Sequence, residues 1–239
     1  FGGGNLVPLK IAAVATEERE ELDNLRYSLS IGSDGAAIAV LGMNAPYSGN
    51  AQKIALFLEY IRTLHPQQLV LCVDAYDVLF FGDVVEMIPR WFAVQQKSII
   101  FSAESVSYPD LGIARLYNED KRYLNSGSFI GRAADLVKML TTISLYPSLY
   151  VSDQRAFVRY YLGNTETIGL DVASDVFLTL HGVTTDGSIR DKRFISGGKK
   201  PLVVHGNAGG EGGKKHYREL VKGLRGGVDV IVRPPLFGA

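Results

Sequence analysis

Cysteine is almost missing from this sequence of 239 residues, because Cys72 is the only one. A single cysteine excludes an intramolecular disulfide framework, and it excludes zinc or iron–sulfur sites that are built from several cysteines. Since Cys72 lies inside the apolar run 69–73, we interpret it as a small buried hydrophobic residue.

The sequence also has no net charge, because 25 Lys and Arg residues balance 25 Asp and Glu residues. No bulk attraction to nucleic acid or to an anionic membrane follows, so we expect no nucleic-acid partner. No apolar run reaches the length of about 18 residues that a membrane span needs, and none is predicted. The first residues lack the basic-then-apolar order of a signal peptide, which leaves the compartment open at this point.

Short apolar runs alternate with longer amphipathic stretches, an order typical of an α/β domain. Apolar residues make up 46% of the sequence and charged residues 21%, as in globular chains that bury a proper core. We find no linker or repeat and expect residues 1–239 to form one domain. Strands are predicted at 9–15, 36–41, 69–73, 98–102, 128–131, 176–180 and 202–205. Helices are predicted from an N-cap at Thr16 to residue 29, and at 51–65, 84–94, 133–145 and 153–162.

Two carboxylates, Asp74 and Asp77, directly follow the apolar run 69–73. In open α/β sheets, ligands bind beyond the carboxyl ends of the strands. Two carboxylates about one turn apart can share a hard divalent cation, and that cation could bridge the phosphates of a nucleotide. The alternative is that one aspartate caps the next helix while the other is solvated, and both interpretations stay open.

A second predicted strand, 202–205, ends in the polar residues His205, Gly206 and Asn207. If this strand end lies beside Asp74 and Asp77, His205 could supply an imidazole ligand to the same metal. Two carboxylates and one imidazole suit Mn²⁺ better than Mg²⁺ or Ca²⁺, which prefer all-oxygen ligand sets. The alternative is a hydrogen-bonded structural histidine.

The glycine-rich stretch 206–215 follows that strand, as a phosphate-binding P-loop would. It lacks the P-loop pattern, because Ala208 stands at the first glycine and Lys215 at the required serine or threonine. We expect a flexible lid whose Lys214 or Lys215 closes on a diphosphate. The alternative is a mobile glycine loop.

Two further polar residues stand out, Asn125 between apolar neighbours and Asp153 at the start of a predicted helix. Asn125 is also compatible with a turn, and Asp153 with the first turn of a helix whose N-cap is Ser152. The sequence contains neither Gly-x-Ser-x-Gly nor His-Glu-x-x-His, so no hydrolase motif is present. The residues alone therefore predict a metal-assisted nucleotide site.

Taken in order, a series of motifs resembles the glycosyltransferase domain of the procollagen lysyl hydroxylases, a family of multifunctional collagen-modifying enzymes. The resemblance covers roughly residues 9–220. The motifs are Val14-Ala-Thr16, Gln52-Lys53, Val73-Asp-Ala-Tyr-Asp-Val78, Phe101-Ser-Ala-Glu104, Tyr108-Pro109, Arg122-Tyr-Leu-Asn-Ser-Gly127, Phe129-Ile-Gly131, Asp153-Gln154 and Pro201-Leu-Val-Val-His-Gly-Asn207.

The resemblance implies a GT-A type fold, in which a Rossmann-like nucleotide half joins an acceptor half. It implies Mn²⁺-dependent transfer, with Mg²⁺ as the alternative metal, of a hexose from UDP-glucose or UDP-galactose. The acceptor would be a hydroxyl group on a glycan or on a hydroxylysine-type protein site. The family also implies the lumen of the secretory pathway, whereas a microbial or viral source would imply the cytoplasm.

The same resemblance assigns roles to single residues. The metal ligands would be Asp74, Asp77 and His205. The catalytic residues would be Asp153, which orients the acceptor hydroxyl or stabilises the cationic sugar, and Asn125, which flanks the sugar. The nucleotide would bind to Val14, Ala15 and Thr16 at the uracil, to Tyr76 near the nucleoside, and to Lys53, Gly206, Asn207 and Lys214 on the phosphate side.

Three departures from the family fall where donor and acceptor would bind. Tyr47 is the only aromatic residue in 42–49, where the family has a tryptophan. Ser107-Tyr108-Pro109 replaces a Cys-Trp-Pro, and Asp153 alone represents a run of several acids. The sugar and acceptor preferences therefore stay open.

Two other classes of function are compatible with these residues. A catalytically silent nucleotide- or glycan-binding module would bind UDP without consuming a UDP-sugar. A sugar nucleotidyltransferase would release pyrophosphate, and it would usually carry a glycine-rich basic loop after the first strand, where residues 15–18 are acidic instead.

Overall fold

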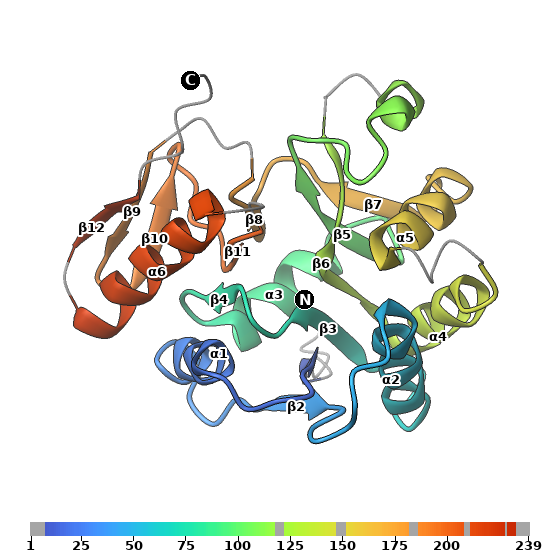
Figure 1. Cartoon of the computed structure of the whole chain (residues 1–239), viewed down its shortest axis with the longest axis horizontal. Coiled ribbons are helices and arrows are strands. Elements are labelled where there is room, and N and C mark those ends of the chain that lie inside the picture. The colour runs from blue at the N-terminus through green and yellow to red at the C-terminus, as the bar shows by residue number, and fades with distance from the viewer. Residues whose placement is uncertain are drawn as a thin grey trace, which may run out of the picture.

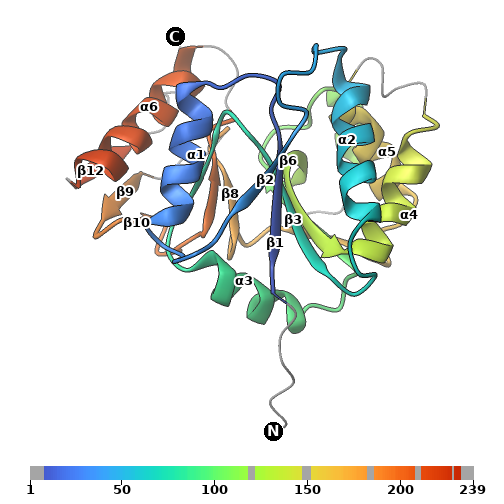
Figure 2. The same cartoon turned by 90° about the horizontal axis from the view of Figure 1, so that it is seen from below.

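The computed structural model describes residues 8–117, 122–146, 152–181, 186–207, 211–227 and 229–232. It confirms the α/β prediction, because helices cover both faces of a central six-stranded sheet (Figures 1 and 2). All strand pairs in this sheet are parallel except those of β6, which runs antiparallel to both neighbours. In order, the strands are β2 (Ile38–Leu41), β1 (Lys10–Val14), β3 (Leu69–Asp74), β6 (Tyr123–Arg132), β5 (Ile99–Glu104) and β7 (Ile168–Asp171).

The helices divide between the two faces of this sheet, as Figure 2 shows. One face packs against α1 (Glu20–Ser30) and α3 (Val84–Ala93). The other face packs against α2 (Asn50–Arg62), α4 (Ala133–Ile143) and α5 (Asp153–Leu162). Both faces are therefore buried, which explains why the strands between them read as continuous apolar runs.

The strand β3 shows how the sequence pattern sets the two cores. Its residues from Leu69 to Val73 are all buried, as predicted for a central strand. Because side chains alternate along a strand, Leu71 faces the core on the α1 side and Val70 faces the core on the α2 side. Cys72 joins the second core with no exposed surface, which confirms its interpretation as a buried hydrophobic residue.

The burial of Cys72 leads to a chemical prediction. Burial raises the pKa of its thiol far above the usual value, and a buried, protonated thiol is a poor nucleophile. We expect a disulfide reagent such as DTNB to leave the native protein unmodified and to label one thiol after unfolding in guanidinium. Rapid labelling of the native protein would contradict this packing.

Two smaller sheets flank the central one. The first has the order β4 (Val78–Phe80), β11 (Val203–His205), β8 (Phe177–Thr179), and the second has the order β10 (Arg193–Ser196), β9 (Gly187–Arg190), β12 (Val230–Val232). In the antiparallel pair of β4 and β11, His205 lies opposite Val78. This register places His205 beside the turn that follows β3.

Two predicted boundaries are wrong for identifiable reasons. The strand predicted at 128–131 begins earlier, at Tyr123, so Asn125 lies in β6 and not in a turn. The first helix begins at Glu20 with Arg19 as its N-cap, not at Thr16. The carbonyl of Thr16 instead accepts a hydrogen bond from the backbone of Asn44, which holds this segment outside the helix.

The lid predicted at 206–215 is replaced in part by α6 (Glu211–Gly226), which contains Lys214 and Lys215. Residues 208–210 lie outside the described residues. Glycine disfavours helix, but Tyr217, Leu220 and Leu224 recur at helical spacing and pack into one buried cluster. Packing of this apolar face outweighs the local preference.

Candidate functional site

Asp74, Asp77 and His205 converge at one point of the fold. Asp74 ends β3, Asp77 lies in the turn before β4, and His205 ends β11. Each offers a ligand atom, and these atoms lie within 4.8 Å of one another. His205 Nε2 is 3.2 Å from Asp77 Oδ1 and 3.7 Å from Asp74 Oδ2.

Backbone geometry holds this cluster together. The amide of Gly206 donates a hydrogen bond of 2.7 Å to the carbonyl of Asp77, which joins the two strand ends. The imidazole of His205 lies against Gly127, where a Cβ atom would stand 2.0 Å from His205 Cε1. Only glycine leaves room for the ring there, which gives a structural reason for the last residue of the Asn-Ser-Gly motif.

Asn125 orients the imidazole of His205. His205 Nδ1 is 3.0 Å from Asn125 Oδ1, and this oxygen also accepts a hydrogen bond of 2.9 Å from the backbone amide of Gly127. An amide oxygen only accepts, so Nδ1 carries the proton and Nε2 faces the two carboxylates. A metal-ligating histidine usually donates the N–H of its other ring nitrogen to an acceptor of this kind.

The charges of Asp74 and Asp77 favour the binding of a cation at this cluster. Burial opposes the charged form of His205, but the adjacent Asp77 and Asp74 outweigh it and raise the pKa of His205 above its usual value. Burial likewise opposes the charge on Asp77, and His205 with Lys53 holds the pKa of Asp77 below its usual range. Two carboxylates and one inward-facing imidazole nitrogen therefore form a donor set that fits a divalent metal such as Mn²⁺.

Lys53 and Asp153 extend the cluster. Lys53 Nζ lies 2.5 Å from Asp74 Oδ1 and 3.0 Å from Asp153 Oδ2. Burial opposes the charge on Lys53, but Asp153 and Asp74 outweigh it and keep the pKa of Lys53 above its usual value. Asp153 starts α5, whose N-cap is Ser152, as the sequence predicted.

Glu104 is a buried carboxylate that the sequence analysis left without a role. Its side chain is 2% exposed at the end of β5, where it accepts hydrogen bonds from Gln154 Nε2 (2.6 Å) and Asn207 Nδ2 (3.0 Å). Burial raises its pKa, although hydrogen bonds from Gln154 and Asn125 oppose the shift. Its position at a strand end is the same signal that identified Asp74, so the sequence could have revealed it.

The residues predicted at the nucleoside lie next to this cluster. Val14 pairs with Asp74 in the sheet, and Ala15 and Thr16 follow it directly. The hydroxyl group of Tyr76 donates to the carbonyl of Glu17 (3.0 Å), which ties the ring to this segment. The Arg19 guanidinium lies 4.6 Å from the centre of the Tyr76 ring.

Of the residues predicted on the phosphate side, the structure describes Gly206 and Asn207 but not the side chain of Lys214. The side chain of Asn207 donates to Glu104 and accepts from the backbone amide of His181, so its amide group is engaged on both sides. Gly206 stands at the end of β11 beside Asn207. The side chain of Lys214 lies outside the described residues.

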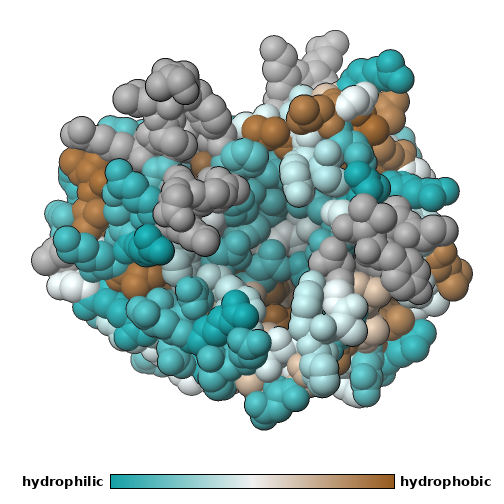
Figure 3. Space-filling view, viewed as in Figure 1, coloured by the Kyte–Doolittle hydropathy of each residue, from teal (hydrophilic) through white to brown (hydrophobic). Residues whose placement is uncertain are grey.

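The segment that carries Tyr108 lies against the N-terminal end of α5. The carbonyl of Tyr108 accepts a hydrogen bond of 2.8 Å from Gln154 Nε2. Asp110 forms an ion pair with Arg155 through two hydrogen bonds of 2.6 and 2.7 Å. The residues Tyr108 and Leu111 are 59% and 72% exposed. Figure 3 shows a largely hydrophilic hollow at the centre of the face that is turned to the viewer, with some hydrophobic residues at its upper edge.

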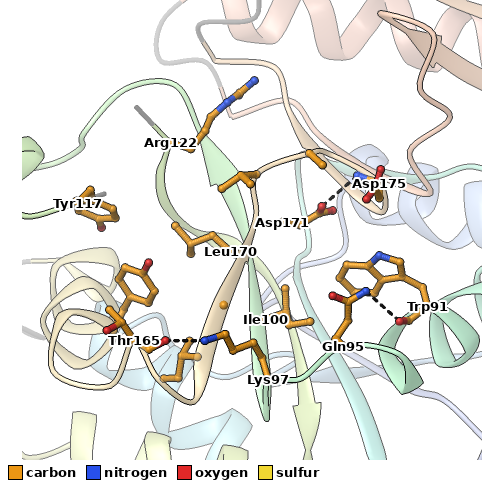
Figure 4. Close-up of a pocket in the computed structure, with 15 residues that line it drawn as sticks. Trp91, Gln95, Lys97, Ile100, Tyr117, Arg122, Thr165, Leu170, Asp171 and Asp175 are labelled. Carbon is orange, nitrogen blue, oxygen red and sulfur yellow. Dashed lines mark hydrogen bonds between the residues drawn. The ribbon is translucent and has the colours of Figure 1, made fainter. Parts of the chain in front are cut away.

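A separate hollow of about 430 Å³ lies along β7 (Figure 4). Its lining does not include Asp74, Asp77 or His205, and several of its polar groups are engaged internally. Lys97 Nζ donates to the carbonyls of Thr165 and Glu166, and the Asp171 carboxylate accepts from three backbone amides.

None of the helices in the described part of the chain has the length and the apolar composition of a membrane span.

Comparison with known proteins identifies the relatives of this chain. The model of the family described as PLOD GT domain matches residues 6–216. "Multifunctional procollagen lysine hydroxylase and glycosyltransferase" of Caenorhabditis elegans is 29% identical over 228 residues, which cover 85% of this chain and 31% of that protein. "Procollagen-lysine,2-oxoglutarate 5-dioxygenase" of Drosophila melanogaster is 28% identical, with coverage of 83% and 30%. "Multifunctional procollagen lysine hydroxylase and glycosyltransferase LH3" of Homo sapiens is 28% identical, with coverage of 83% and 29%. The chain thus spans less than a third of the length of these relatives.

Proposed function

Because the chain belongs to the PLOD GT domain family, the glycosyltransferase domains of the procollagen lysyl hydroxylases, we propose that it transfers a hexose from a UDP-sugar to a hydroxyl acceptor. The six-stranded, mostly parallel sheet between two helical layers is the GT-A type fold expected for that family. The observation that carries the proposal is the convergence of Asp74, Asp77 and His205 beyond the strand ends.

The metal is proposed to be Mn²⁺, held by the carboxylates of Asp74 and Asp77 and by His205 Nε2. When bound, such a metal acts as a Lewis acid that stabilises the negative charge of a departing diphosphate. Asn125 keeps the proton of His205 on Nδ1, so that Nε2 stays free to bind. The proposed role of Asn125 is therefore to position His205.

Lys53 and Asp153 are the groups proposed to act on the reacting atoms. Lys53 stays protonated and adds positive charge on the side where the diphosphate leaves. Sugar transfer develops positive charge at the anomeric carbon, and the Asp153 carboxylate would stabilise that charge or orient the acceptor hydroxyl. Asp153 is ionised for this role, because Lys53 outweighs burial and holds the pKa of Asp153 below its usual value.

The donor is proposed to be UDP-glucose or UDP-galactose. Val14, Ala15 and Thr16 would border the uracil and Tyr76 the nucleoside, which is supported by their position beside Asp74. Gly206 and Asn207 would approach the phosphate side from β11.

The acceptor is proposed to be a hydroxylysine-type protein site or a glycan attached to one. The names of the relatives, which refer to procollagen lysine modification, support this choice. They also favour the secretory-pathway lumen over the microbial or viral alternative. The exposed Tyr108 and Leu111 beside α5 would contact the acceptor.

The proposal is tested by measuring UDP release from a panel of UDP-sugars with Mn²⁺, with Mg²⁺ and with EDTA. We expect slow hydrolysis of one hexose donor that depends on Mn²⁺, and faster release when a hydroxylysine peptide is added. Metal-dependent UDP binding without consumption of any donor, with the peptide present, would instead identify a silent binding module. Release of pyrophosphate would identify a nucleotidyltransferase.

A further inference from the structure

We propose that Lys53 is an exchangeable counter-ion of the metal site, which holds Asp74 in the metal-free protein and releases it when a divalent cation binds. The inference rests on the proposed function only in taking Asp74, Asp77 and His205 as the metal ligands. It assigns to Lys53 control over how tightly the protein binds its metal.

The position of Asp74 makes Lys53 and a metal competitors. One oxygen of its carboxylate, Oδ1, is 2.5 Å from Lys53 Nζ, while the other, Oδ2, faces His205 Nε2 at 3.7 Å. A cation held by Asp74, Asp77 and His205 would therefore share this carboxylate with the ammonium group. Two positive charges that share one carboxylate repel each other strongly where solvent access is limited.

Asp153 gives Lys53 an alternative partner. The Lys53 side chain is only 16% exposed, so its charge needs a carboxylate within reach at all times. Asp153 Oδ2 lies 3.0 Å from Lys53 Nζ and belongs to α5, outside the predicted ligand set. The four-carbon stem of lysine permits a small shift of the ammonium group towards Asp153. Release of Asp74 therefore leaves no unpaired buried cation.

The charge of Lys53 already acts on the rest of the cluster. Its ammonium group lies 2.5 Å from one oxygen of the Asp74 carboxylate, and the other oxygen of that carboxylate is 3.7 Å from His205 Nε2. A positive charge this close to the ligands must oppose the binding of a dication to them. Metal affinity should therefore be lower with Lys53 than without it, in the absence of nucleotide.

The same exchange prepares the site for a diphosphate. Once Lys53 has left Asp74, one side of its ammonium group is free to pair with an anion next to the metal. Lys53 thus lowers the affinity for the metal alone. It raises the affinity for a nucleotide diphosphate once the metal is bound. A neutral residue at position 53 should change these two affinities in opposite directions, which a loss of structure would not do.

The experiment titrates the full chain with Mn²⁺ in the absence of nucleotide and measures free Mn²⁺ by electron paramagnetic resonance. Lys53→Met should bind Mn²⁺ about tenfold more tightly, because one positive charge is removed beside the site. Lys53→Arg keeps the charge and should remain close to the wild type. The matched control is Lys97→Met, a partly buried lysine bound to backbone carbonyls outside the cluster, which should change nothing.

A second titration measures the binding of UDP by calorimetry at saturating Mn²⁺. Lys53→Met should bind UDP about tenfold more weakly than the wild type. Unchanged or weaker Mn²⁺ binding by Lys53→Met would overturn the inference. Lys53→Gln, which keeps a donor for Asp74, gives the same test if the methionine variant does not fold. Failure of the wild type to bind Mn²⁺ would instead contradict the proposed function, so the two failures are distinguishable.

Discussion

Asp77→Asn is expected to reduce UDP release from the preferred donor by at least about 10²-fold, the scale at which a preorganised charged group contributes to catalysis. Asp77 is ionised, because His205 and Lys53 outweigh burial and hold its pKa below the usual range. An asparagine oxygen keeps the shape of the side chain but not its negative charge. The donor set of Asp74, Asp77 and His205 then loses one of its two carboxylates.

The fold should survive this substitution. The Asp77 side chain is 39% exposed, and its partner His205 can lose its proton, so no unpaired charge is left in the interior. Circular dichroism and urea unfolding should therefore resemble those of the wild type. Asp23→Asn, an exposed acid on α1 that pairs with Arg26, is the control and should keep full activity. Full activity of Asp77→Asn would exclude the proposed metal ligands.

Glu104→Ala is expected to destabilise the protein by about 3 kcal/mol, because a buried donor and a half-buried donor lose their acceptor. Gln154 Nε2 and Asn207 Nδ2 both point at this carboxylate. Gln154 keeps the carbonyl of Tyr108 as a second acceptor, whereas the structure shows no other acceptor for Asn207 Nδ2 among the described residues. The cost should therefore arise mainly at Asn207, which joins Glu104 to the segment after β11.

The free energy of unfolding in urea measures this cost. Glu104→Gln keeps one acceptor oxygen, so its free energy of unfolding should lie between those of the wild type and the alanine variant. Glu59→Ala, an exposed glutamate on α2, is the matched control and should change stability by less than about 0.5 kcal/mol. A loss below about 1 kcal/mol in Glu104→Ala would show that the neighbouring amides find other partners.

Local patterns predicted the elements with long apolar runs. The continuous run before Asp74 identified β3, and the amphipathic stretches identified α2, α4 and α5. The motifs in order also predicted the family that the comparison confirms. These features depend on neighbours in the sequence, so they are visible without a structure.

Elements that contain polar residues or glycine were not predicted from such patterns. The four-residue strands β7, β9 and β10 each contain glycine or polar residues, so no continuous apolar run marks them. The helix α6 begins in glycines and forms because its apolar face packs against a cluster contributed by distant strands. Local propensity predicts a loop there, and tertiary packing decides otherwise.

For the candidate site, the sequence by itself determined which chemical groups are available and that Asp74, Asp77 and His205 follow strands. Only the tertiary structure decided which of them meet. Asn125 and His205 are 80 residues apart, and Lys53 and Asp153 are 100 apart, yet each pair is in hydrogen-bond contact. The first contact arises from strand order and register and the second from the packing of α2 and α5, and neither can be recognised from the residues around either partner. The proton on His205 and the partner of Lys53 are therefore properties of the fold.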